Sequence, residues 1–104
     1  MSDDIVWHKV AEIDELADGR VKTVVAGRKS LALARYQGAY GALDNHCPHQ
    51  GGPLGEGYLD GKQVTCPWHA WTFDVTTGAC ETTPQIKQKT FKTKIENGDV
   101  FVEI

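Results

Sequence analysis

Two short segments, each carrying one cysteine and one histidine, constrain this chain more than any other feature. The first reads C-P-H from Cys47 to His49, and the second reads C-P-W-H from Cys66 to His69. Sixteen residues separate the two segments. Together they supply two thiolates and two imidazoles, so a fold that brings them together can hold a metal centre. We therefore take these four side chains as the candidate ligands.

The donor set distinguishes between two kinds of centre. Two cysteines and two histidines are the ligands of a Rieske-type 2Fe-2S cluster, in which two histidines replace two cysteines on one iron. Structural zinc sites also use two of each, but usually as paired cysteines and paired histidines. Here each segment is a mixed pair, with one intervening residue in the first and two in the second. The mixed pairs favour the iron–sulfur cluster, and a zinc-stabilised interaction module stays open as an alternative.

Three further residues could be mistaken for ligands. Cys80 is spare, and we expect an inert thiol there, with a fifth ligand or a redox thiol as the alternatives. His46 adjoins Cys47, but neighbouring side chains in extended backbone point in opposite directions. We therefore expect His46 to lie at the surface or to bond within its loop. His8 is expected to be structural.

The composition bounds the class of protein. At 104 residues the chain is expected to form one domain over 1–104. Its net charge of −3 disfavours nucleic acid as a partner. No apolar run approaches the ~20 residues that span a bilayer, and the acidic start of the chain does not resemble a secretory signal. We therefore expect no membrane association, and a reducing, cytoplasmic location in which cysteines serve metal binding.

The hydrophobic pattern is nearly all β. Short runs with strand character alternate with turn signals, and only Ile13–Ala17 hints at a helical turn. Asp60-Gly61 is a hairpin signal, and Asn97-Gly98 is the strongest turn signal in the chain. Such spacing predicts a small sandwich or barrel. We expect strands at residues 20–26, 31–36, 39–44, 57–59, 62–65, 71–75, 90–96 and 99–104.

The candidate ligands fall where this pattern breaks. Residues 46–57 are dense in glycine and proline, which indicates a shaped loop rather than a strand. Residues 66–70 follow the second half of a predicted hairpin. Two such loops at neighbouring hairpin tips can each supply a cysteine and a histidine. Backbone amides in glycine-rich loops can also donate hydrogen bonds to the sulfides of a cluster.

At these positions the chain resembles the soluble Rieske-type ferredoxins, especially those of aromatic-ring-hydroxylating dioxygenase systems that degrade aromatic hydrocarbons. Residues 47–54 and 66–74 carry the resemblance, and the downstream Thr77-Gly78 and Pro84 also fit. It implies an all-β Rieske fold of three stacked antiparallel sheets with a small cluster-binding subdomain. It also implies one 2Fe-2S cluster, whose buried iron is held by Cys47 and Cys66.

The same resemblance assigns roles to the remaining site residues. His49 and His69 hold the outer iron, and a third loop near Pro84 covers the cluster. Leu54 and Pro84 shield it from water. Trp68 either helps a partner to dock near the electron exit or packs across its own loop.

Sequence differences from the respiratory Rieske proteins predict the reduction potential of the cluster. Trp71 and Phe73 stand where those proteins carry a serine and a tyrosine that bond the cluster sulfurs. Phe73 has no donor, and Trp71 offers at most an indole N–H. Fewer donors stabilise the reduced state less, so we expect a potential at the low end of the Rieske range.

The resemblance implies a one-electron carrier between an NAD(P)H-dependent flavoprotein reductase and a terminal oxygenase. A small subunit of a larger redox enzyme, such as an assimilatory nitrite reductase, is the alternative. We expect no enzyme activity of the chain alone, because it has no dinucleotide-binding glycine fingerprint. Four acidic residues form either a docking face near the cluster or only a solvated surface. They are Glu56, Asp60, Asp74 and Glu81.

Overall fold

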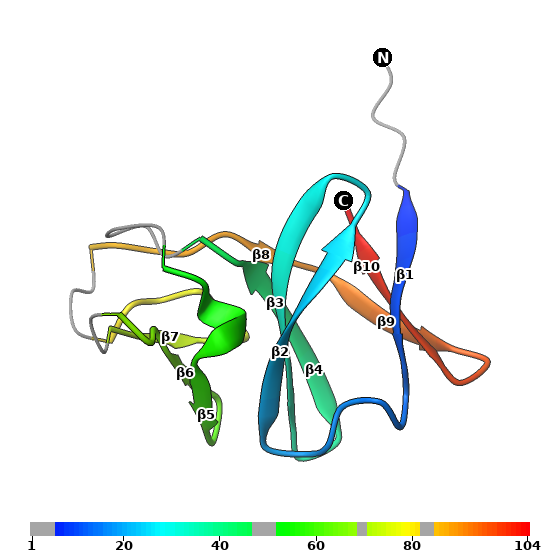
Figure 1. The fold of residues 1–104 in the computed structure, drawn as a ribbon, viewed down its shortest axis with the longest axis horizontal. Coiled ribbons are helices and arrows are strands. Elements are labelled where there is room, and N and C mark those ends of the chain that lie inside the picture. The colour runs from blue at the N-terminus through cyan, green and yellow to red at the C-terminus, as the bar shows by residue number, and fades with distance from the viewer. Residues whose placement is uncertain (1–5, 47–51, 69–70, 82–84) are drawn as a thin grey trace.

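The computed structural model of this chain describes residues 6–46, 52–68, 71–81 and 85–104. Within these ranges the chain forms strands, turns and one short 3-10 helix, and no α-helix (Figure 1). The elements are β1 Trp7–Glu12, β2 Arg20–Ala26, β3 Lys29–Tyr36, β4 Ala39–Asp44, η1 Leu54–Glu56, β5 Tyr58–Asp60, β6 Gln63–Thr65, β7 Thr72–Asp74, β8 Thr90–Phe91, β9 Thr93–Glu96 and β10 Asp99–Glu103. The all-β expectation is confirmed. No helix of the described residues is long and apolar enough to cross a membrane.

The described strands form three antiparallel sheets. The first has the order β1-β10-β9, the central one β2-β3-β4-β8, and the third, built of three-residue strands, β5-β6-β7. In Figure 1 the β5-β6-β7 sheet lies on one side of the central sheet and the β1-β10-β9 sheet on the other. This is the predicted arrangement of stacked sheets with a small unit at one end.

Turn chemistry places most hairpins where the sequence indicates them. Asn97 and Gly98 both have positive φ, of 54° and 80°, and join β9 to β10. Two successive residues with positive φ fit the type I′ turn that matches strand twist. The hairpin of β5 and β6 differs from expectation by one residue. Asp60 pairs with Gln63, so the loop is Gly61-Lys62 rather than Asp60-Gly61, and Gly61 takes the positive φ of 61°.

Two local expectations were wrong. The single strand expected at 90–96 is interrupted at Lys92, because β8 pairs with β4 in the central sheet whereas β9 pairs with β10. The segment therefore crosses from one sheet to another. The expected helical turn near residue 13 is a hydrogen-bonded turn without a helix, in which the Glu15 N–H donates to the Glu12 carbonyl at 3.0 Å.

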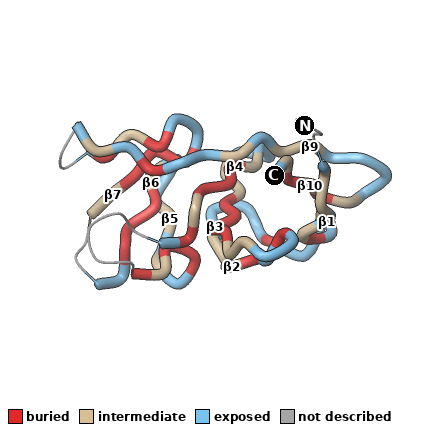
Figure 2. Tube along the Cα trace, turned by 90° about the horizontal axis from the view of Figure 1, so that it is seen from above, coloured by how far each residue is buried: buried red, intermediate tan, exposed pale blue. Residues whose placement is uncertain are grey.

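Strand β3 separates two hydrophobic cores. Its side chains alternate between the faces of the sheet, so Leu31 and Leu33 face one core while Ala32 and Ala34 face the other. All four are buried, and Figure 2 shows the buried stretch along β3. The leucine face packs against the β1-β10-β9 sheet. The alanine face packs against the β5-β6-β7 sheet and η1, and its small side chains allow close approach.

Candidate metal centre

Asn45 closes the neck of the first predicted ligand loop. Its main-chain carbonyl accepts the Leu54 N–H at 2.8 Å, and its side-chain oxygen accepts the Gly55 N–H at 2.7 Å. Its amide nitrogen donates to Ser30 Oγ at 3.0 Å. Only 7% of Asn45 is exposed. One residue at the end of β4 therefore holds both ends of the loop together and ties them to β3.

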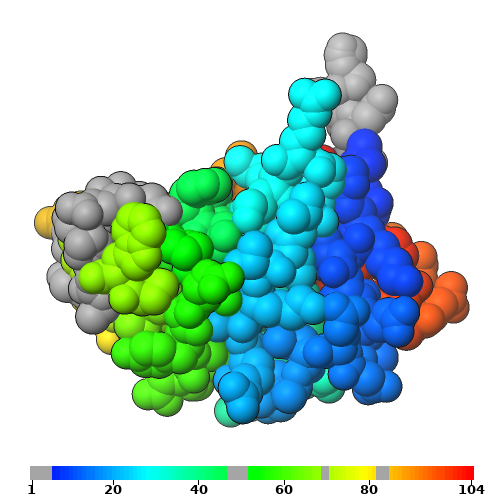
Figure 3. Space-filling model, viewed as in Figure 1, coloured from blue at the N-terminus to red at the C-terminus, as the bar shows by residue number. Residues whose placement is uncertain are grey.

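The C-terminal end of this loop, which contains η1, is tightly packed against the neighbouring strand. η1 lies against β2, where a Cβ at Gly55 would stand 2.6 Å from the Thr23 backbone nitrogen. Figure 3 shows the green segment of η1 in contact with the blue strand β2. Leu54, the first residue of η1, is fully buried beside Cys66 in the core under the loop. The predicted shielding residue thus lies next to Cys66, the predicted ligand that the structure describes.

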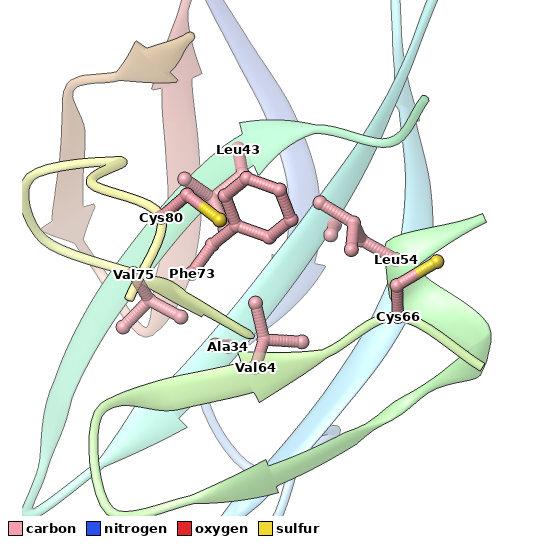
Figure 4. Packing of buried hydrophobic residues seen from close by; sticks show 9 residues of the cluster. Ala34, Leu43, Leu54, Val64, Cys66, Phe73, Val75 and Cys80 are labelled. Atoms are coloured by element: carbon pink, nitrogen blue, oxygen red, sulfur yellow. The ribbon is translucent and has the colours of Figure 1, made fainter. Parts of the chain in front are cut away.

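Cys66 opens the second loop. It follows β6 directly, and its N–H donates to the Trp71 carbonyl at 2.8 Å, just beyond the last strand pair, Thr65 with Thr72. The loop is therefore the tip of the β6–β7 hairpin, as predicted. Cys66 is 1% exposed and forms no disulfide. In Figure 4 its sulfur points away from the packed core side chains, toward the side of the loops.

Gly52 brings the first loop onto that sulfur. A Cβ at Gly52 would stand 2.9 Å from Cys66 Sγ and 3.0 Å from a ring carbon of Trp68. The two predicted ligand loops thus meet at the thiol of Cys66, with room for glycine and for nothing larger. A centre with ligands from both loops needs this convergence. A buried thiol with its sulfur turned out of the core fits a metal or cluster ligand.

Several predicted site residues lie outside the described residues. They are Cys47, His49, His69 and Pro84. Their roles stay predictions.

The two tryptophans of the second loop differ in burial. Trp68 is 58% exposed, and one edge of its ring covers Gly52. Trp68 thus contacts the first loop and leaves an exposed aromatic surface, and its role in docking stays a prediction. Trp71 is half-buried and packs against the same core as Leu54 and Cys66.

The residues set aside as ligands occupy other environments. Cys80 is 1% exposed, and its sulfur points toward the ring of Phe73 within the core, which fits an inert thiol (Figure 4). His46 is exposed, and its Nδ1 lies 3.4 Å from Asp44 Oδ1. His8 is half-buried on β1, against Gly27.

Asp74 belongs neither to an acidic docking face nor to a solvated surface, contrary to both expectations. Asp74 is buried, and its Oδ1 accepts hydrogen bonds from the Thr76 N–H at 2.7 Å, from the Thr76 hydroxyl, and from the Thr77 N–H at 3.2 Å. Lys62 Nζ lies 3.5 Å from its Oδ2. Burial raises the pKa of Asp74, but these hydrogen bonds and Lys62 outweigh it, so the pKa lies below its ordinary value. Asp74 builds the turn after β7, whereas Glu56, Asp60 and Glu81 are exposed.

Asp44 has a similar role at the start of the first loop. Its Oδ1 accepts the His46 N–H at 3.0 Å, and Lys29 Nζ lies 3.3 Å from its Oδ2. Burial raises the pKa of Asp44, but the His46 N–H and Lys29 hold it below its ordinary value. The carboxylate is therefore charged at neutral pH and fixes the first bend of the loop.

Sequence reasoning missed two residues that organise the loops, Asn45 and Gln88. Both are buried polar side chains with several hydrogen bonds. An asparagine directly after a predicted strand and before a glycine-rich loop is a signal that could have identified the first. No local signal identifies Gln88, because the two carbonyls to which its side-chain amide donates are more than forty residues away in the chain.

A separate cavity lies away from the candidate centre. It is an open groove of about 860 Å³ on the edge of β8, with Lys29, Lys89 and Phe91 among its walls. Its described lining includes none of the predicted cluster residues, so it is not part of this site.

Comparison with known proteins identifies the relatives of this chain. The sequence model of the Rieske [2Fe-2S] domain matches residues 6–96. The ferredoxin component of the naphthalene 1,2-dioxygenase/salicylate 5-hydroxylase systems of Ralstonia sp is 36% identical over 99 residues, which cover 94% of this chain and 95% of that protein.

Solved structures share the fold over nearly the whole chain. A chain in the complex of reduced oxygenase and oxidized ferredoxin of carbazole 1,9a-dioxygenase superposes with a TM-score of 0.86 at 30% identity, covering 93% of this chain and 92% of that one. The small subunit of a putative NADH-dependent nitrite reductase from Mycobacterium tuberculosis superposes with a TM-score of 0.89 at 23% identity, covering 98% and 97%. At 23% identity, the similarity to the nitrite reductase subunit shows a shared fold only.

Proposed function

The chain belongs to the Rieske [2Fe-2S] domain family, and we propose that it carries single electrons from a flavoprotein reductase to a terminal oxygenase. It holds one Rieske-type 2Fe-2S cluster and is an electron-transfer component, not an enzyme by itself. When bound, the cluster takes up and releases one electron. The observation that carries the proposal is the likeness to ferredoxin components along their whole length, together with the meeting of both loops at Cys66.

In this proposal Cys47, His49, Cys66 and His69 hold the cluster. Support comes from the donor set, which is that of a Rieske centre, and from the buried, unbridged thiol of Cys66. Two thiolates and two imidazoles carry less negative charge than four thiolates. The cluster accepts an electron more readily for that reason.

In this proposal, residues around the cluster exclude water from it or contact the redox partners. Leu54 excludes water from the side of Cys66, and we assign the same role to Pro84 in a third loop. The cluster-binding loops are taken as about 46–57 and 66–70, within one domain over 1–104. Trp68, exposed next to the centre, offers an aromatic contact to the electron acceptor.

The reductase in this proposal is an NAD(P)H-dependent flavoprotein, and the location is the cytoplasm. The ferredoxin relatives and the solved complex of a ferredoxin with its oxygenase support an oxygenase as the acceptor, whereas the reductase and the location are inferred from the resemblance to these ferredoxin components. The nitrite reductase alternative has only the fold in its favour. The zinc alternative is not retained, since the family carries a 2Fe-2S cluster.

An EPR-monitored redox titration of the anaerobically purified protein tests the proposal. We expect a Rieske signal on reduction, with a midpoint toward the low end of the range of roughly −150 to +300 mV. Phe73 offers no donor to the cluster sulfurs, which is the reason for the low value. A signal that appears only at high potential would contradict the role next to a flavoprotein reductase. A protein without any Rieske signal would contradict the cluster itself.

Electron delivery needs a second assay with partners. A purified ring-hydroxylating oxygenase and a flavoprotein reductase, mixed without a ferredoxin, give the background rate of NAD(P)H-dependent product formation. Addition of this chain should raise that rate, and the Cys66→Ala variant should not. If the wild-type protein shows a low-potential Rieske signal but reduces no oxygenase, its electron acceptor belongs to another class of protein.

A further inference from the structure

We propose that Gln88 is a positioning residue for the first ligand loop. Its side chain binds the backbone at the start of that loop, and its own backbone is bound to the turn after β7. This inference rests on the proposed function, since it concerns the cluster. Gln88 is not one of the ligands. It acts through the backbone at the point where the chain enters Cys47.

The side chain of Gln88 uses all of its hydrogen-bonding groups inside the protein. Its Nε2 donates to the Asp44 carbonyl at 2.9 Å and to the His46 carbonyl at 2.6 Å. Its Oε1 accepts the Lys89 N–H at 3.0 Å. Only 8% of the residue is exposed. The two main-chain carbonyls that flank Asn45 thus share one buried amide group.

This amide continues the ladder between β4 and β8. Ala42 and Leu43 pair with Phe91 and Thr90, and the Asp44 N–H donates to the Lys89 carbonyl at 2.9 Å. Beyond Lys89 the two backbones separate. The side chain of Gln88 then supplies the donors that a neighbouring strand would supply. Gln88 thereby holds the backbone carbonyls on both sides of the bend at Asn45, up to His46, the last residue before the predicted ligand Cys47.

The backbone of Gln88 is held by a different segment. Its N–H donates to the Gly78 carbonyl at 2.7 Å, and the Gly78 N–H donates to the Asp74 carbonyl at 2.7 Å. A Cβ at Gly78 would stand 2.1 Å from the Gln88 carbonyl oxygen, and Gly78 has a φ of +80°. Only glycine fits both requirements. Gln88 is therefore tied by its backbone to the turn after β7 and by its side chain to the first loop.

These contacts make Gln88 a junction of three segments. One is the end of β4, which leads into the first loop. Another is the turn after β7, which leads away from the second loop. The third is the chain that returns from the predicted covering loop near Pro84. Partners outside the ligand shell fix the orientation of ligands, and their loss typically weakens metal binding by about 10–100-fold. Loss of the Gln88 donors would leave two carbonyls at the loop entrance unsatisfied.

The test compares two glutamine substitutions in the cluster-loaded protein. Gln88→Met keeps the length of the side chain and removes its donors. Gln63→Met is the control on β6, because Gln63 is half-buried and its Oε1 has no hydrogen-bond partner among the described residues. Three quantities are measured for each variant. They are the thermal midpoint, the EPR spectrum of the reduced protein, and the rate of iron release to a chelator well below that midpoint.

We expect Gln88→Met to release iron about ten-fold faster than Gln63→Met or more. Its EPR signal should be broadened or shifted, and its thermal midpoint should lie below that of the control, because two buried carbonyls lose their donors. A role in packing alone would move the midpoint without the spectrum. Release rates and spectra that match those of Gln63→Met overturn the proposal.

A conservative variant covers the case in which Gln88→Met takes up no cluster. Gln88→Asn keeps the amide on a side chain that is one methylene shorter. It should take up the cluster and release iron faster than the wild type, and release at the wild-type rate overturns the proposal. If the wild-type protein itself shows no Rieske signal, it is the proposed function that fails. A wild-type Rieske signal together with an unaffected Gln88→Met variant removes only the role of Gln88.

Discussion

Gly52 lies directly against the sulfur of Cys66, although the two residues belong to different loops. A Cβ at Gly52 would stand 2.9 Å from that sulfur, a distance that real Cβ atoms do not tolerate. A flexible surface group could move away, but Cys66, as the proposed cluster ligand, cannot move without losing its ligand geometry. We therefore expect that a side chain larger than that of glycine at residue 52 interferes with cluster binding.

Gly52→Ala should therefore lower the iron content of the purified protein and increase its rate of iron release. Its control is Gly19→Ala, where φ is +83° and no atom lies within 4 Å of a Cβ. That change costs about 1 kcal/mol of backbone strain at a site without cluster contacts. It should leave iron content unchanged. Equal iron content in both variants would show that residue 52 has room to spare.

The two buried cysteines of the core allow a matched test of the ligand assignment. Cys66 and Cys80 are both 1% exposed and lie in the same core cluster. Cys66→Ala should abolish the Rieske EPR signal, because it removes a thiolate ligand. Cys80→Ala should keep the signal and lose about 1 kcal/mol of stability through a small cavity. If Cys80→Ala also loses the signal, Cys80 is more than a packing residue.

Substitutions of two histidines test whether the predicted ligand His69 and the non-ligand His46 are correctly distinguished. His69→Cys should strongly alter or abolish the Rieske spectrum, since one imidazole donor is replaced by a thiolate. His46→Ala should leave the spectrum intact, because the exposed His46 ring faces Asp44 rather than the ligand loops' junction. The visible and EPR spectra of the two variants decide the matter. A cluster lost from His46→Ala means that the ligand set is misassigned.

The carboxylate of Asp74 predicts a pH dependence of stability. Its pKa is lower in the folded than in the unfolded chain, so it stabilises the fold at pH values above its unfolded pKa of about 4. That contribution is lost as the pH falls through the folded pKa. Asp74→Asn should cost about 2 kcal/mol at neutral pH, typical of hydrogen bonds to a charged group. Urea denaturation of both proteins at several pH values measures the difference.

The difference between wild type and Asp74→Asn should stay constant from pH 7 to about 5 and shrink below about 4. Lys62→Met is a useful companion, because Lys62 contacts the same carboxylate from a more exposed position. It should have the smaller effect, as exposed ion pairs contribute at most about 1 kcal/mol. A stability difference for Asp74→Asn that persists unchanged at pH 3 would falsify this account of Asp74.

The strands at residues 20–26 and 39–44 and the Asn97-Gly98 turn could be predicted from local sequence, because strand alternation and turn chemistry act within a few residues. The hairpin at Gly61-Lys62 was placed one residue too early, since the register of the Asp60–Gln63 pair decides which residues form the loop. The strand at 90–96 was expected to be continuous. Its break at Lys92 follows from the exchange of partner sheets, which local sequence does not encode.

By itself, the sequence determined the all-β class, and it predicts the donor set of the centre and the loops that carry it. These follow from residue chemistry and from spacing along the chain. The tertiary structure alone decided that Gly52 meets Cys66, that Asp74 turns inward, and that β3 divides two cores. It also decided that Gln88 reaches across to His46. Such contacts depend on sheet order and register, which arise from burial of the whole chain and not from any short segment of it.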